Sequence, residues 1–376
     1  MFYKKFVTLA LISFSLLVFA CESAEENVTE VVTQENNTTE IAIENESVEK
    51  INVLATTPMI AEYVRQVGND NIDLNILMPY SADPHSFEAS PQDAKKIADA
   101  DLVFYVGLKY ESANLVELLE NSVSSEDILI EIGPSINPIE FSEEGHDDHE
   151  GHDDHEGHEG HEGHDHGIYD PHFWFDPVRV SMAVEVIKDE LIKNDSANES
   201  SYASAADSFV SELEALDQNV VAMFETIPVE NRKIITTHEA LGYLEAKYEI
   251  EVLTTIIPSL NSEDGITPKS LRNAIEVIEK NKIEVMFLEA ESSSQYSEVI
   301  EQETGIALVS GLWVETLQEN QSYVEWLENN VTIIVNNLPT EVHDDHDHDH
   351  DHDDHDDDDH DDDDDHDGHD HGKKDK

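Results

Sequence analysis

Hydrophobic and polar residues alternate along the first half of the chain as they do in α/β proteins. Short apolar runs predict strands, and apolar residues spaced three and four apart predict helices between them. The expected strands are 51–57, 72–78, 101–107 and 127–133, and the expected helices are 58–66, 91–100 and 114–121. Ser90 can cap the second helix, because a serine hydroxyl accepts a backbone N–H at a helix start.

The same alternation returns in the second half, after a stretch with helical periodicity only. Residues 178–193 and 202–224 are helical in period, with no strand between them. The expected strands that follow are 233–237, 249–257, 283–289 and 305–310, and the expected helices are 238–248, 268–281, 295–304 and 321–337. We therefore predict an α/β fold with two lobes, each with a mostly parallel sheet flanked by helices, and a ligand cleft between them.

The N-terminus has the pattern of a targeting segment. Lys4 and Lys5 precede an apolar run that is too short to span a membrane comfortably, and Ala20 precedes the only cysteine, Cys21. This pattern resembles a bacterial or archaeal lipoprotein signal, which would make Cys21 the lipidated first residue of the mature chain. A plain secretory signal with an incidental cysteine is the alternative.

Composition divides the rest of the chain. Two segments repeat histidine with acidic residues and cannot bury enough apolar surface to fold alone. The predicted divisions are a signal peptide (1–21), a disordered acidic tether (22–50), an N-terminal lobe (51–175) with a His-rich loop (143–167), linking helices (176–230), a C-terminal lobe (231–342) and a disordered His/Asp-rich tail (343–376).

The charge and cysteine content exclude several classes of function. The net charge of −66 would repel a phosphate backbone, so we expect no nucleic-acid partner and an attraction for cations instead. A single cysteine cannot form an internal disulfide or a multi-cysteine zinc site. Any bound metal must therefore be held by histidine and carboxylate.

Three histidines stand apart from the repetitive segments. Of the 21 histidines, eight lie in 143–167 and ten in 343–376, which leaves His85, His172 and His238. The first two each end an Asp-Pro-His sequence, and the third ends a predicted strand. Three converging imidazoles would form the protein part of a tetrahedral zinc site, with a carboxylate or water in the fourth position.

The residues around these histidines fit the same interpretation. Proline before His85 and His172 stiffens the backbone that presents each imidazole. Asp83, Asp170 or Asp176 could orient an imidazole by accepting its second ring N–H. Each histidine taken alone would be an ordinary polar loop residue, but the three together, beside two histidine-rich segments, favour a metal site.

At these motifs the chain resembles the cluster A-I solute-binding proteins of zinc and manganese ABC transporters. The matching segments are 78–93, 169–177, 237–252 and, more loosely, 286–292. The resemblance implies two α/β lobes joined by a long, rigid helix, with His85, His172 and His238 holding metal between them. It also implies an ABC permease and its ATPase as partners, and the His-rich loop before His172 points to zinc.

The fourth ligand departs from the family pattern. Family members often supply an aspartate near the last strand, but residues 309–316 contain none. Glu289, at the end of a predicted strand, is our first candidate, Glu315 is the next, and water is an equal alternative. Three imidazoles suit Zn²⁺ better than Mn²⁺, which prefers more oxygen ligands.

We expect a monomeric, lipid-anchored, extracytoplasmic protein that captures Zn²⁺ for an ABC permease and performs no chemistry on it. The alternatives are a manganese-selective protein of the same kind, or a surface metal buffer or adhesin acting through the His/Asp segments. These segments would gather metal near the cleft, or serve only as acidic spacers. A hydrolase using Glu239 as base is disfavoured, because no H-E-x-x-H helix or nucleophile elbow is present.

Overall fold

The structure is a computed structural model that describes residues 50–80, 82–141, 169–291 and 296–341. The predicted signal peptide, the His-rich loop, the tail and all of the tether except Lys50 lie outside the described residues. The assignments made for those segments therefore stay predictions. The described residues all belong to one compact unit.

The first lobe is built on a parallel sheet of four strands in the order β2-β1-β3-β4. Helices cover both faces of the sheet, because successive residues of β1 point to opposite sides: Val53 packs in one hydrophobic cluster and Leu54 in another. Ser90 begins α2 as predicted, in a capping box with Asp93. The elements are β1 Ile51–Ala55, α1 Pro58–Gly68, β2 Ile72–Ile76, α2 Pro91–Ala98, β3 Leu102–Tyr105, α3 Ala113–Ser122 and β4 Leu129–Glu131.

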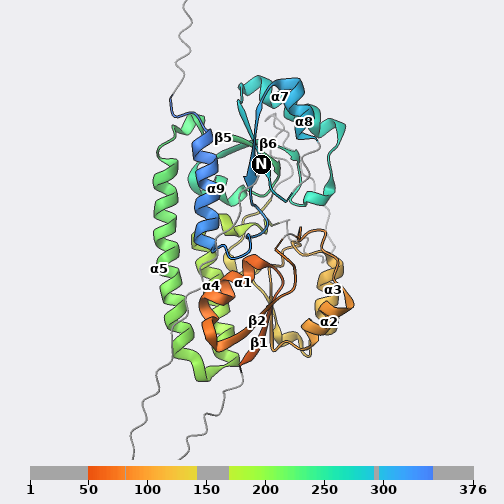
Figure 1. The fold of residues 1–376 in the computed structure, drawn as a ribbon, viewed down its shortest axis with the longest axis vertical. Coiled ribbons are helices and arrows are strands. Elements are labelled where there is room, and N and C mark those ends of the chain that lie inside the picture. Colours follow the sequence, from red (N-terminus) through yellow and green to blue (C-terminus); the bar gives the residue numbers. More distant parts are fainter. Residues whose placement is uncertain (1–49, 81, 142–168, 292–295, 342–376) are drawn as a thin grey trace, which may run out of the picture. The chain divides into compact units, whose positions relative to one another are not determined.

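Two helices follow without a strand between them, as the periodicity predicts. They are α4, Pro177–Asn194, and the long α5, Glu199–Phe224. Helix α5 packs against α4 and contacts both α1 of the first lobe and α9 of the second (Figure 1). The long linking helix of the predicted fold is therefore present, and it packs on both lobes.

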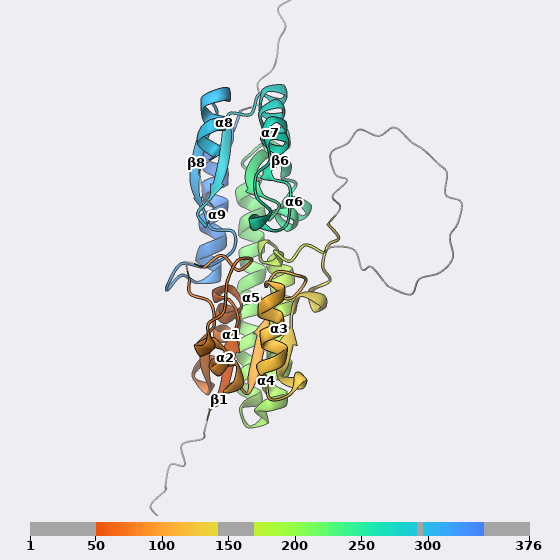
Figure 2. The same ribbon diagram turned by 90° about the vertical axis from the view of Figure 1, so that its right-hand side faces the viewer.

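The second lobe contains parallel strand pairs rather than one continuous ladder. Strands β5 and β6 pair in parallel, as do β7 and β8, and β5 lies against β7. Helices α7 and α8 pack on one side of these strands and α9 on the other (Figure 1). Figure 2 shows α7 and α8 beside each other at the top of the view. The elements are β5 Lys233–His238, α6 Gly242–Tyr248, β6 Glu251–Ile257, α7 Pro268–Asn281, β7 Val285–Glu289, α8 Ser297–Thr304, β8 Ala307–Leu312 and α9 Tyr323–Asn337.

The fold confirms the predicted class, with two local differences. The single sheet expected in the second lobe is divided into two pairs. The helix expected from residue 238 begins only at Gly242, because His238 is still paired with Ile257 as the last residue of β5. His238 is thus the last residue of β5, and its ring centroid lies 6.1 Å from that of His85 in the first lobe.

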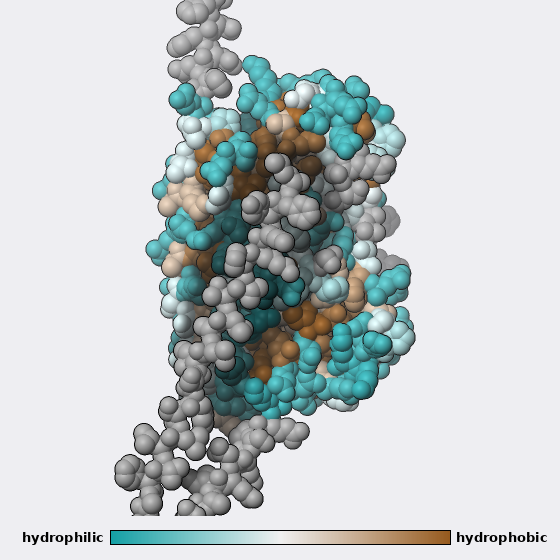
Figure 3. Space-filling view, viewed as in Figure 1, coloured by the Kyte–Doolittle hydropathy of each residue, from teal (hydrophilic) through white to brown (hydrophobic). Residues whose placement is uncertain are grey.

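Hydrophilic residues cover much of the face seen in Figure 3, and hydrophobic residues show within both lobes. Within the described part of the chain, no helix is both long and apolar enough to cross a membrane.

Candidate metal centre

The structure brings the three isolated histidines together with Glu315. Each lies at the end of a strand or in a loop: His85 follows β2, His172 precedes α4, His238 ends β5 and Glu315 follows β8. One ligand atom from each lies within 4.8 Å of the ligand atoms of the others, and all four residues are buried. The group therefore joins residues from both lobes.

Three imidazole nitrogens face one carboxylate oxygen. The distance from Glu315 Oε1 to Nε2 is 3.5 Å for His85, 3.3 Å for His172 and 2.8 Å for His238. Among the described residues, none of these three nitrogens and neither Glu315 oxygen has a hydrogen-bond partner. Buried polar atoms without partners are costly, so this set of atoms fits a cation placed between them.

The two Asp-Pro-His sequences fold in the same way. Asp83 Oδ1 accepts the backbone N–H of His85 at 2.9 Å, and Asp170 Oδ1 accepts that of His172 at 2.8 Å. This is an Asx-turn, in which an aspartate side chain bonds the backbone two residues later, and the intervening proline suits it because its φ is fixed. The repeated tripeptide thus presents two imidazoles from similar turns.

Carboxylates also hold two of the three rings. Asp170 Oδ1 lies 2.8 Å from Nδ1 of His172. Glu289 Oε2 lies 2.6 Å from Nδ1 of His238, and Glu289 Oε1 accepts the His238 backbone N–H at 2.9 Å. An acceptor at Nδ1 places the proton there and leaves Nε2 free to bind a cation.

Of the three aspartates predicted to orient an imidazole, one has that role in the structure. Asp170 orients a ring as expected, whereas Asp83 bonds only the backbone of its histidine. Asp176 was wrongly assigned to this role: it caps α4 by accepting the N–H of Val178 and pairs with Lys247 at 3.0 Å.

Glu289, our first candidate for the fourth ligand, does not belong to the group. Glu289 is the last residue of β7, and its carboxylate lies at Nδ1 of the His238 ring. The nitrogen that faces the other ligands is Nε2, on the opposite side of the ring. Glu315, the second candidate, supplies the carboxylate that faces the three Nε2 atoms.

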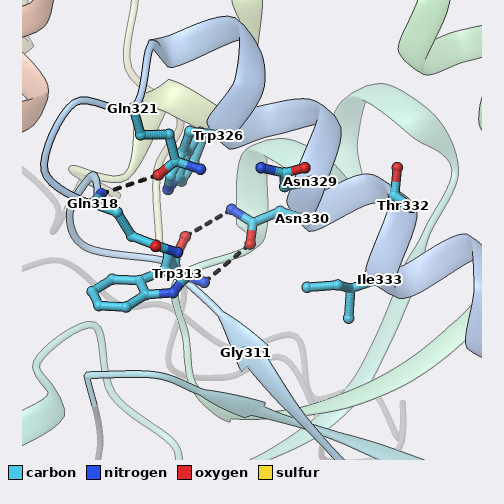
Figure 4. Close-up of a pocket in the computed structure, with 9 residues that line it drawn as sticks. All are labelled: Gly311, Trp313, Gln318, Gln321, Trp326, Asn329, Asn330, Thr332 and Ile333. Carbon is cyan, nitrogen blue, oxygen red and sulfur yellow. Dashed lines mark hydrogen bonds between the residues drawn. The ribbon is translucent and has the colours of Figure 1, made fainter. Parts of the chain in front are cut away.

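The loop that carries Glu315 is held by its own lobe. Asn330 of α9 accepts the N–H of Trp313 at 3.0 Å and donates to its carbonyl at 2.7 Å (Figure 4). These bonds border a cavity of about 260 Å³ whose lining includes both residues. Glu291 accepts N–H groups from Val314 and Glu315, at 3.4 and 3.1 Å.

The same loop is also bonded from across the centre. The indole N–H of Trp174 donates to the Val314 carbonyl at 2.7 Å, and the Tyr110 hydroxyl donates to the Glu315 carbonyl at 3.0 Å. The Tyr110 ring lies edge-on to His85, with ring centroids 5.0 Å apart. Sequence reasoning did not identify the two hydrogen bonds, because each joins residues more than a hundred positions apart.

Burial and charge oppose one another at this centre. Burial alone would lower the pKa of His172, but the Glu315 charge and the Asp170 hydrogen bond outweigh it and raise that pKa to about 9. Burial alone would raise the pKa of Glu315, but His172 and His85 hold it well below its usual range. Burial, together with the Glu315 charge, raises the pKa of Glu291 to about 8. Glu315 is thus ionised and ready to bind a cation.

A family comparison agrees with this geometry. The model of the family described as "Zinc-uptake complex component A periplasmic" matches residues 53–337. The chain belongs to this family. The match spans both lobes and all four residues of the centre, and it confirms the resemblance seen in the motifs. Proteins of the zinc-uptake component A family are solute-binding parts of metal ABC transporters.

Named relatives extend the comparison. The chain is 25% identical over 299 residues to "Metal ABC transporter substrate-binding lipoprotein ScbA" of Streptococcus cristatus, covering 77% of this chain and 89% of the relative. It is 24% identical over 346 residues to "Manganese ABC transporter substrate-binding lipoprotein PsaA" of Streptococcus anginosus, covering 89% and 99%. Among solved structures, the periplasmic zinc-binding protein TroA of Treponema pallidum matches with a TM-score of 0.67 and 20% identity, covering 77% of this chain and 99% of TroA. At that identity the likeness shows the fold.

Proposed function

We propose that this protein captures Zn²⁺ outside the cytoplasm and delivers it to an ABC permease for uptake. The ion would bind between the lobes to His85, His172, His238 and Glu315. The observation that carries the proposal is the group of buried, unpartnered Nε2 and carboxylate atoms that face one another. The permease and its ATPase follow from the family, whose members are components of such transporters.

The spacing of the donor atoms supports a small tetrahedral ion. Zn–N and Zn–O bonds of about 2.0–2.2 Å place neighbouring donors of a tetrahedron about 3.3–3.6 Å apart. The Glu315 oxygen lies 2.8–3.5 Å from the three nitrogens. The carboxylate oxygen therefore lies near donor spacing from all three nitrogens, and all the ligand atoms lie within 4.8 Å of one another.

The donor types favour zinc over manganese. Three imidazoles and one carboxylate suit Zn²⁺, whereas Mn²⁺ prefers more oxygen donors. The family description and the name of TroA refer to zinc. Asp170 and Glu289, which hold two of the rings at Nδ1, further favour a site that binds through neutral Nε2 atoms.

Manganese is the second candidate. PsaA of S. anginosus is named for manganese, and both Glu315 oxygens lack partners among the described residues. Bidentate binding by Glu315 would raise the ligand number to five and the oxygen content to two, which moves the site towards manganese chemistry.

We infer that the protein is not a hydrolase. Glu239, the candidate base, accepts the hydroxyl of Thr255 at 2.9 Å. His172 and His238 are fully buried, so a substrate could not reach the metal without separation of the lobes. A water-activating zinc enzyme needs an open coordination position, and here Glu315 faces that position.

We further propose that the protein is a monomer anchored by a lipid on Cys21. Several relatives are named lipoproteins, which supports the anchor.

We also propose that the His/Asp segments 143–167 and 343–376 collect cations near the centre. Neutral imidazoles beside carboxylates give weak, exchanging sites. A manganese carrier, or a surface buffer or adhesin acting through those segments, are the alternatives.

Competition between the protein and a zinc chelator tests the function. The full-length protein should hold one tightly bound zinc ion and several weakly bound ones. The variant with His85→Ala, His172→Ala and His238→Ala should lose the tight ion and keep the weak ones. Equal tight binding by both proteins would overturn the proposed centre, and tighter binding of Mn²⁺ than Zn²⁺ would establish the second candidate.

A further inference from the structure

One hydrogen bond ties the loop of His85 to the opposite lobe. The Ser262 hydroxyl donates to Asp83 Oδ2 at 2.7 Å. Asp83 lies between β2 and α2 of the first lobe, and Ser262 begins the short 3₁₀ turn Ser262–Asp264, between β6 and α7 of the second. The bond is partly buried and joins residues 179 positions apart, so it depends on how the two lobes meet.

Asp83 divides its two oxygens between two tasks. Oδ1 accepts the backbone N–H of His85 at 2.9 Å, and Oδ2 accepts the hydroxyl of Ser262. The His85 ring lacks the restraint that its two counterparts have, because its Nδ1 has no hydrogen-bond partner among the described residues. The position of the His85 backbone therefore depends on Asp83, and Asp83 is held in turn by Ser262.

We propose that Ser262 and Asp83 form a latch that keeps the His85 loop closed on the second lobe and slows the release of bound metal. The proposal rests on the metal-binding function proposed above. The four metal-binding groups are buried and come from both lobes, so we expect the ion to leave as the lobes move apart. Separation breaks the bond between Ser262 and Asp83.

The latch predicts a kinetic effect. A hydrogen bond to a carboxylate is stronger than one between neutral groups. Because this bond forms after the lobes close, its loss should accelerate dissociation and leave association nearly unchanged. In the part of the chain that the structure describes, Ser262 bonds Asp83 and does not belong to the group of metal-binding residues, so the metal ligands themselves stay intact in a Ser262 variant.

Stopped-flow release of zinc into excess chelator tests the latch. Full-length protein is loaded with less than one equivalent of zinc, so that the tight site fills first. We expect Ser262→Ala to raise the dissociation rate constant about fivefold to tenfold, given the strength of charge-assisted bonds. Ser262→Thr keeps the hydroxyl and should restore slow release. Ser211→Ala is the matched control, since the Ser211 hydroxyl bonds only its own helix, at the Asp207 carbonyl.

Measurements on the metal-free protein distinguish the loss of the latch from a general loss of stability. The melting temperature of metal-free Ser262→Ala should equal that of the wild type, because the latch acts on the closed, metal-bound state. The latch would be overturned if Ser262→Ala released zinc at the wild-type rate, or if the metal-free variant melted at a lower temperature than the metal-free wild type. Either result would leave the proposed metal site unchanged. Failure of the wild type to bind zinc tightly would instead overturn the proposed function.

Discussion

The two Asp-Pro-His turns share a sequence and a backbone bond, yet they hold their imidazoles differently. Asp170 bonds both the backbone and the ring of His172, which is fully buried. Asp83 bonds the backbone of His85 and also Ser262 of the other lobe, and the His85 Nδ1 has no hydrogen-bond partner among the described residues. The same tripeptide thus supplies one fixed imidazole and one whose placement depends on lobe closure.

This difference suggests an order of events in binding. His172 and His238 are each held at Nδ1 by a carboxylate of their own lobe, so each ring is preorganised within its lobe. The His85 ring has no such partner among the described residues, and its placement is completed as the lobes meet. Preorganised ligands lower the cost of binding, and a late ligand controls the rate of release.

Removing the imidazoles one at a time gives the largest expected contrast. Both His172→Ala and His85→Ala should lower zinc affinity by more than about a hundredfold, since each removes a direct ligand. His172→Ala should destabilise the metal-free protein by about 2 kcal/mol and His85→Ala by less, because only the His172 ring is hydrogen-bonded by a carboxylate, that of Asp170. Urea unfolding of the metal-free variants measures this, and equal destabilisation by both would remove the contrast.

Changing the aspartates gives a smaller effect. Asp170→Asn removes the charge at Nδ1 of His172 and should lower zinc affinity about tenfold, as ligand-orienting carboxylates usually do. Asp83→Asn keeps an oxygen for the His85 N–H and an amide group beside Ser262, so we expect less than about a threefold change. Chelator competition compares the two variants, and a larger loss in Asp83→Asn would reverse the assignment.

The smallest effect concerns pH. Because the pKa of His172 is raised to about 9, its ring is an imidazolium at pH 7, with a second proton besides the one shared with Asp170. Zinc must displace this second proton. Apparent zinc affinity should therefore rise with pH up to about 9. By linkage, the paired ring stabilises the metal-free protein fully below its unfolded pKa of 6.5, and that stability is lost as pH rises through about 9.

Calorimetry in two buffers of different ionisation enthalpy measures this proton. At pH 7 the wild type should release at least one proton for each zinc ion bound at the tight site. Glu315→Gln, which removes the charge that raises the pKa of His172, is the comparison and should release fewer. Heats that do not depend on the buffer would contradict the assigned pKa.

Much of this architecture could be predicted from local sequence. The alternating strands and helices, the long linking helix and the convergence of three histidines follow from periodicity and from the positions of His85, His172 and His238 outside the repetitive segments. The Asx-turns also have a local cause, since aspartate and histidine lie two residues apart in both.

The fourth carboxylate could not be predicted in the same way. Glu289 ends β7 and Glu315 follows β8, and the packing of β7 against β5 places the Glu289 carboxylate at Nδ1 of His238. The Glu315 loop is positioned by Asn330, Trp174 and Tyr110, through bonds between distant residues. No local pattern in the sequence encodes those bonds.

The most direct test of the account is X-ray absorption spectroscopy of full-length protein loaded with less than one equivalent of zinc. We predict four ligands, three imidazole nitrogens and one carboxylate oxygen, at about 2.0–2.2 Å. Glu315→Ala should lose the carboxylate, whereas Glu289→Ala should keep the full set of four. A wild-type spectrum with fewer imidazoles, or a set of ligands unchanged in Glu315→Ala, would contradict the proposed centre.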